Sequence, residues 1–214
     1  RGAAAPWAFV AQSAPAKEAI LAERAVAPLD RASAEVLLAE AKAAMRGNAL
    51  SSRGPFAAAY ALAKLGDTAA ADRAMALSVA RDPRNVVGQQ WLVARSVRAG
   101  DYVQALRHLD AIMRLRPALQ ADITRAMVPF LRAPNMVEAF VEAGQSNPPW
   151  MPLFIDNAAR DAQSADGLYR LMRELAAKPA VDLPPAAITQ VVQAALARGE
   201  DGQAVAVYRA FFPS

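Results

Sequence analysis

Cysteine is absent from the 214-residue chain, and histidine occurs once, at position 108. The first absence excludes disulfide bonds, thiolate zinc sites and cysteine nucleophiles. The second leaves His108 as the sole imidazole able to serve as a general base or a metal ligand, and a zinc site needs further His or Cys ligands. We therefore predict no catalytic residue, no metal and no cofactor, and we expect His108 to lie half-exposed on a helix.

Long apolar runs and phosphate-binding loops are also missing. No uninterrupted apolar run reaches the length of a membrane span. The Gly-containing segment 199–202 carries two acidic residues, so it suits a turn between helices and not a phosphate cradle. Asp156, Asp161 and Asp166 recur every five residues, a spacing that spreads them around a helix and does not form a paired-carboxylate site. An enzyme has almost no support from these residues.

Alanine dominates what is present. Hydrophobic residues make up 55% of the chain but aromatic residues only 7%, and Ala favours helix because it loses no side-chain entropy there. No stretch has the alternating, β-branched pattern of a strand. The net charge is +4, and residues 51–117 hold ten Lys or Arg against five Asp or Glu, so the whole positive excess lies in that segment. The composition predicts an all-α protein.

Two segments, 65–83 and 99–117, align at a spacing of 34 residues. In each, a Gly accepts the left-handed conformation that ends a helix, and the Asp after it accepts hydrogen bonds from the first amides of the next helix. A small Ala follows where helices cross closely, and a Pro stops the helix. The matched positions are Gly66 and Gly100, Asp67 and Asp101, Ala71 and Ala105, and Pro83 and Pro117.

This pattern resembles the tetratricopeptide repeat family, which carries a Gly-Asp-aromatic turn, a small residue five positions after the Gly, and a Pro seventeen after it. The second segment matches in full, with Tyr102 as the aromatic residue, whereas Thr68 replaces the aromatic residue in the first. The first-helix signature is weaker, since Val93 is large for its position and Ser96 replaces the usual Tyr. The resemblance implies a right-handed α-solenoid of antiparallel helix pairs.

The repeat period is clearest over 52–117 and decays outside it. We expect an irregular N-terminal tether at 1–14, repeat-like helices over 15–147 and a degenerate continuation over 148–214, with a seam near the Asn147-Pro148-Pro149 break. Ser33 is the expected cap of its helix, and Pro129 is expected to kink or end another. The predicted helices are 16–27, 33–46, 55–65, 68–81, 86–99, 101–115, 118–132, 135–144, 150–162, 165–177, 185–198 and 201–212.

In the family, the first helix of each repeat lines the inner surface. The residues that the resemblance places in this groove are Arg53, Phe56, Tyr60, Lys64, Gln90, Ala94 and Arg98. A groove that mixes cations with aromatic rings suits an acidic or aromatic peptide. The alternative is that Phe56 and Tyr60 are core residues. One version of the family grips a C-terminal carboxylate with a Lys/Asn/Arg clamp, and Phe56, Tyr60 and Trp91 stand at clamp positions here, so chaperone-tail binding is not expected.

We interpret the chain as a protein-binding scaffold, with a protein or acidic peptide as its partner. Its Ala/Arg-rich, Lys-poor usage resembles high-GC bacterial proteins, and repeat proteins of this type often accompany secretion or polysaccharide-assembly machinery of the cell envelope. The alternative is a nucleic-acid-binding solenoid that uses the basic segment 51–117, which acids and scattered Arg residues disfavour. Because the chain starts at Arg1, we expect a preceding signal peptide, anchor or tag, and membrane contact only through such an anchor. A periplasmic or membrane-anchored location is favoured over a cytoplasmic one.

Overall fold

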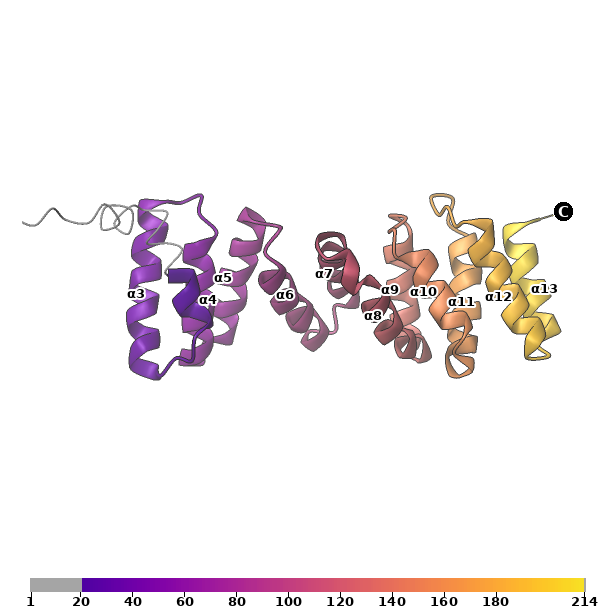
Figure 1. Ribbon diagram of the computed structural model, residues 1–214, viewed down its shortest axis with the longest axis horizontal. Helices are drawn as coiled ribbons and strands as arrows, with labels where there is room; N and C mark the ends of the chain where they lie inside the picture. Colours follow the sequence, from indigo (N-terminus) through magenta and orange to yellow (C-terminus); the bar gives the residue numbers. More distant parts are fainter. Residues whose placement is uncertain (1–20, 214) are drawn as a thin grey trace, which may run out of the picture. The chain divides into compact units, whose positions relative to one another are not determined.

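The computed structural model describes residues 21–213, so the expected tether at 1–14 lies outside the described part of the chain. Within residues 21–213 every regular element is a helix and no strand occurs (Figure 1). The all-α prediction is confirmed, and most observed bounds lie within a few residues of the predicted ones. The predicted helix 118–132 is instead a short α-helix between two 3-10 helices, and residues 16–20 of the predicted helix 16–27 lie outside the described range. After a helical stretch at 21–26, the α-helices are α3 (Arg31–Gly47), α4 (Arg53–Leu65), α5 (Thr68–Arg81), α6 (Val86–Arg98), α7 (Tyr102–Leu115), α8 (Gln120–Met127), α9 (Pro134–Gly144), α10 (Met151–Ala159), α11 (Ala165–Ala176), α12 (Pro185–Ala197) and α13 (Asp201–Phe211). The 3-10 helices are η1 (Pro117–Leu119), η2 (Val128–Arg132) and η3 (Ala162–Ser164).

The chain forms two compact units that divide within α6, the first ending at Arg95 and the second beginning at Ser96. In the first unit, α4 packs against α3 on one side and against α5 on another. Close packing is possible because α4 is rich in small residues: Ala57 and Ala59 are fully buried, and Gly54 lies so near α3 that an added Cβ would stand 2.8 Å from Met45 Cγ. As a result α4 is buried over most of its circumference.

The second unit has two layers of helices. One layer contains α8, α10 and α12, which contact in that order, and the other contains α7, α9, α11 and α13, which also contact in order. Helices α10 and α11, and α12 and α13, pack on each other as consecutive pairs. This is the arrangement of a helical solenoid, in which each pair buries its apolar faces against the next pair. The largest buried side chains include Trp150, Tyr169, Phe140 and Phe154, and the last two rings stack with centroids 4.5 Å apart.

The turns before α5 and α7 have the geometry that the sequence predicts. Gly66 and Gly100 are left-handed, with φ of 91° and 71°. The Asp67 and Asp101 side chains each accept a hydrogen bond from the backbone N–H three residues on, at 2.9 and 3.1 Å. Gly199 repeats the left-handed turn before α13, with φ of 73°. Each turn therefore ends one helix at a glycine, and an Asp side chain starts the next in the two clearest cases.

The small residues and prolines of the repeat also lie as expected. Ala71 and Ala105 are both buried near the start of their helices. Helix α5 ends at Arg81 and α7 ends at Leu115, each two residues before its proline. Pro129 acts in a similar way, because α8 stops at Met127 and the chain continues as the 3-10 helix η2.

One capping prediction is wrong. The N-cap of α3 is Asp30, whose carboxylate accepts from the backbone N–H of Ser33 at 2.7 Å, so α3 begins earlier than expected and Ser33 donates instead of accepting. The segment at Asn147 lies inside the second unit. The Asn147 amide donates to the carbonyl of Ala180 at 2.7 Å and accepts from the N–H of Asp182 at 2.8 Å. These bonds join the Asn147-Pro148-Pro149 segment to the loop at residues 180–182.

Candidate functional site

The exposed surface of α4 is a narrow strip along one side of the helix. Arg53 and Lys64 are its exposed residues, and Tyr60 lies between them, half-buried. Successive spacings of seven and four residues put these side chains in line along an α-helix. Because α3 and α5 pack on α4, its remaining side chains are buried or half-buried. We call Arg53, Tyr60 and Lys64 the α4 strip.

A cluster of three aromatic rings supports the α4 strip from beneath. The Phe56 and Tyr60 rings are tilted, with centroids 5.1 Å apart, and Tyr60 meets Trp91 edge-on at 5.4 Å. Phe56 is only 7% exposed and belongs to the core of the first unit, whereas Tyr60 packs against that core and keeps part of its surface in solvent. Burial raises the pKa of the Tyr60 phenol, so this side chain presents a neutral hydroxyl and an aromatic edge.

Trp91 fixes the position of the aromatic cluster. Its indole Nε1 donates a 2.8 Å hydrogen bond to Oδ1 of Asp72 on α5, and Arg95 Nε lies 3.7 Å from the other carboxylate oxygen, Oδ2. A half-buried aromatic ring whose N–H has a hydrogen-bond partner is restrained in its orientation. Trp91 therefore joins α5 to α6 and holds the ring of Tyr60.

Each end of the α4 strip has an acidic residue in its surroundings. At the Lys64 end lies Asp30, whose pKa is lowered first by the Ser33 backbone N–H, then by the Ser33 hydroxyl, and further by the Lys64 ammonium. At the other end, Arg53 borders a polar hollow of about 430 Å³, which Arg81 and Asp82 also line. One carboxylate thus lies near each end.

The other residues predicted for the groove lie on α6, which the division between the two units crosses. Gln90 and Ala94 are exposed on the part of α6 that belongs to the first unit. Arg98 is exposed on the last turn of α6 and belongs to the second unit. The candidate site therefore consists of the α4 strip with its aromatic support, and Gln90 and Ala94 are exposed residues of the same unit.

A polar cluster in the second unit escaped the sequence analysis. The hydroxyl of Tyr169 donates to the carboxylate of Glu200, and Arg198 donates to that hydroxyl, to Glu200 at 3.1 Å and to the carbonyl of Ala159 at 3.0 Å. Burial, followed by the Glu200 hydrogen bond, raises the pKa of Tyr169. The hydrogen bond from Tyr169, followed by that from Arg198, lowers the pKa of Glu200. The cluster joins α10, α11 and the α12–α13 turn, which is a structural role. No periodicity links residues that lie this far apart in the chain.

Among residues 21–213 no group of three or more His, Cys, Asp or Glu side chains is placed to hold a metal ion. His108 lies half-buried on α7. No helix within that range combines the length and apolar character needed to cross a bilayer.

No protein-family model matches the chain, and no curated protein matches it either.

Proposed function

We propose that the chain is a protein-binding helical scaffold and not an enzyme, and that the α4 strip of its first unit contacts an acidic peptide segment of the partner. The observation that carries the proposal is the alternation of cation, aromatic ring and cation along the exposed side of a helix that is otherwise largely buried. Such a strip offers charge-assisted hydrogen bonds at two places and a flat apolar contact between them.

The packing of Tyr60 on neighbouring rings favours a role for the α4 strip in binding a partner. Tyr60 rests on Phe56 and Trp91, and Trp91 is fixed by Asp72, so the Tyr60 ring is already ordered before a partner arrives. An ordered aromatic side chain loses little conformational entropy on binding, which is why such residues carry much of the binding energy in interfaces. A solvent-facing tyrosine without this support would lose more conformational entropy on binding.

We further propose that residues 52–117 are two repeats of the tetratricopeptide type. In support, the glycine turns, the Asp caps and the helix ends recur at the 34-residue spacing. In this proposal α4 and α6 are first helices of their repeats, which is why their exposed residues are assigned to the binding surface. The proposed setting is a bacterial cell-envelope assembly for secretion or polysaccharide export, and its basis is the Ala/Arg-rich composition.

The proposal is tested with short fluorescein-labelled peptides rich in Glu and Phe, measured by fluorescence polarisation against the whole chain. Lys-for-Glu versions of the same peptides and a single-stranded RNA are the competing probes. We expect the acidic peptides to bind more tightly than the basic ones, with an affinity that falls as salt rises.

Matched charge reversals locate the binding surface. Lys64→Glu is compared with Arg73→Glu, which makes the same change of charge on the exposed side of α5, away from the buried face formed by Ala71 and Met75. We expect Lys64→Glu to weaken peptide binding on the order of tenfold, mainly by slowing association, and Arg73→Glu to have little effect. Equal losses in the two variants would assign the binding to net charge alone. Tighter binding of RNA than of any peptide would instead support the nucleic-acid alternative.

A further inference from the structure

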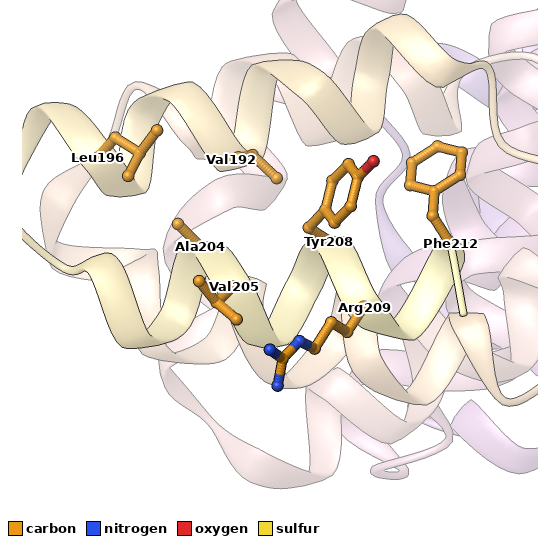
Figure 2. Close-up of a pocket in the computed structure, with 7 residues that line it drawn as sticks. All are labelled: Val192, Leu196, Ala204, Val205, Tyr208, Arg209 and Phe212. Carbon is orange, nitrogen blue, oxygen red and sulfur yellow. The ribbon is translucent and has the colours of Figure 1, made fainter. Parts of the chain in front are cut away.

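Helices α12 and α13 leave an apolar groove exposed in the second unit. Its lining includes Val192 and Leu196 from α12 and Val205, Tyr208 and Phe212 from α13 and its C-cap. Figure 2 shows the Tyr208 and Phe212 rings side by side along α13, with the two α12 side chains on the facing helix. The ring centroids are 5.1 Å apart, and Tyr208 and Leu196 are 53% and 51% exposed. Neighbouring large apolar side chains that are half-exposed indicate a surface that a partner covers.

The exposed side of α13 forms one continuous arc. At about 100° per residue, its exposed positions fall within about 120° of each other on the helix circumference, opposite the buried Val207 and next to the buried Ala204. The arc carries an acid at its start, apolar residues in its middle and a base near its end. Its members are Asp201, Gly202, Val205, Tyr208, Arg209 and Phe212.

This arc is complementary to itself when two copies run antiparallel. With a two-fold axis at Val205, that residue meets its own copy, and Arg209 lies level with Asp201 of the second chain, within reach of its long side chain. The register is sterically open, because a Cβ placed on Gly202 would have no heavy atom within 4 Å, so the Arg209 side chain of the second chain can lie over it. A parallel pair would instead oppose Asp201 to Asp201 and Arg209 to Arg209, which is repulsive.

The two charges at the ends of the arc are available for such pairing. Within residues 21–213 neither Asp201 nor Arg209 makes a side-chain hydrogen bond or ion pair, whereas many other charged residues on the helices of the second unit do, for example Arg114 with Asp110 and Arg160 with Asp156. An isologous two-fold contact forms each Asp–Arg pair twice. A single residue change therefore alters the interface at two places.

We propose that this α13 arc is a self-association surface, through which two copies of the chain pair antiparallel. The occupant is a second copy because the arc supplies, in the right order and spacing, the charges and the small residue that its own opposite end requires. This inference does not rest on the proposed peptide binding, since the two surfaces belong to different units and are altered by different variants.

The test is sedimentation velocity of the whole chain over a wide concentration range. We expect reversible dimerisation of the wild type, and both Asp201→Arg and Arg209→Asp to weaken it on the order of tenfold or more, because each puts two like-charge pairs in the interface. Arg107→Asp, at an exposed position of α7, is the matched control and is expected to dimerise like the wild type. Far-UV circular dichroism confirms that each variant is folded.

Mixing the two weakened variants gives the sharpest result. One chain then carries arginine at both ends of the arc and the other carries aspartate at both ends, so a mixed antiparallel dimer restores two attractive pairs. We expect an equimolar mixture to recover dimerisation that neither variant shows alone. A wild type that is monomeric at every concentration would overturn the proposal and leave the face to a helix of another protein. A dimer insensitive to both reversals, or a mixture that does not recover, would also overturn it.

Discussion

A single methyl group at Gly167 is expected to destabilise the second unit, because α11 lies against the backbone of η2 at this point. A Cβ built on Gly167 would stand 2.0 Å from the carbonyl oxygen of Leu131, 2.7 Å from its carbonyl carbon and 3.0 Å from its Cβ. Leu131 is itself almost fully buried. The clash is with main chain, which has no rotamer to change, so the 3-10 segment or α11 must move.

The magnitude follows from two opposing effects. Overpacking a core usually costs about 1–3 kcal/mol. Replacing Gly by Ala inside a helix stabilises the folded state by about 0.5–1 kcal/mol. Because the obstructing atoms are backbone, we expect the cost to lie at the upper end and the net loss in unfolding free energy of Gly167→Ala to be about 2 kcal/mol. At a urea m-value of about 2 kcal/mol/M, the midpoint falls by about 1 M.

Two further Gly→Ala changes act as matched controls in the same urea titration, followed by circular dichroism at 222 nm. At Gly144 the added Cβ would stand 2.5 Å from Leu175 Cδ2, the tip of a side chain that can rotate, and at Gly47 it would meet nothing within 4 Å. The expected order of stability is Gly167→Ala below Gly144→Ala below Gly47→Ala, the last slightly above wild type. A Gly167→Ala chain as stable as wild type would refute the close approach of α11 to Leu131.

Three other changes are expected to alter stability. Ala105→Leu should cost about 1–3 kcal/mol because Ala105 is almost fully buried on α7, and an unchanged melting temperature would show that Leu fits without strain. The pKa of Asp161 is lowered below 3.8, first by the hydrogen bond from the Ser164 hydroxyl. The stabilisation from the Asp161 carboxylate is therefore present above pH 3.8 and is lost as the pH falls through the folded-state pKa. Ser164→Ala should flatten this acid dependence of stability in unfolding titrations. Arg198→Met is expected to destabilise the second unit by about 1 kcal/mol, because the Ala159 carbonyl and the Tyr169 hydroxyl lose a donor. Arg198→Lys should not restore the loss, because an ammonium lacks the planar fork of the guanidinium, and full rescue by Lys in the same urea titration would contradict this account.

The parts of the fold that the sequence predicts are those set by local backbone chemistry. A Gly-Asp turn specifies both the end of one helix and the start of the next, because the left-handed glycine and the capping carboxylate act within a few residues. Gly66 and Gly100 show this. Pro129 is equally local, since its ring removes a donor from its own helix, and α8 ends two residues before it. Local chemistry is not sufficient at the start of α3, because Asp30 and Ser33 are both residue types that cap helices. The path of the chain into α3 makes Asp30 the N-cap.

The candidate site depends on packing that periodicity does not encode. Helix α4 is buried over most of its circumference, so an apolar stripe does not identify which side faces solvent. Phe56 and Tyr60 are four residues apart and look equivalent in the sequence, yet the first is in the core and the second keeps part of its surface in solvent. The difference comes from α3 and α5, which cover neighbouring sides of α4, and from Trp91, whose hydrogen bond to Asp72 joins residues 19 apart.

Sequence periodicity also does not predict which side chains of the α13 arc are exposed. Val207 and Tyr208 are adjacent in the sequence, and with Ala204 and Phe212 they form one wide apolar stripe that is typical of a helix facing a core. In the structure the stripe is divided: Ala204 and Val207 are buried against the second unit, while Tyr208 and Phe212 stay half-exposed. When an apolar stripe is wider than the core that covers it, part of the stripe stays exposed to solvent. Which part stays exposed can be seen only from the packing of the neighbouring helices. Exposed apolar surface on a folded chain lowers solubility. The presence of Tyr208 and Phe212 beside an unpaired acid and base therefore favours association, and not folding, as the role of these side chains.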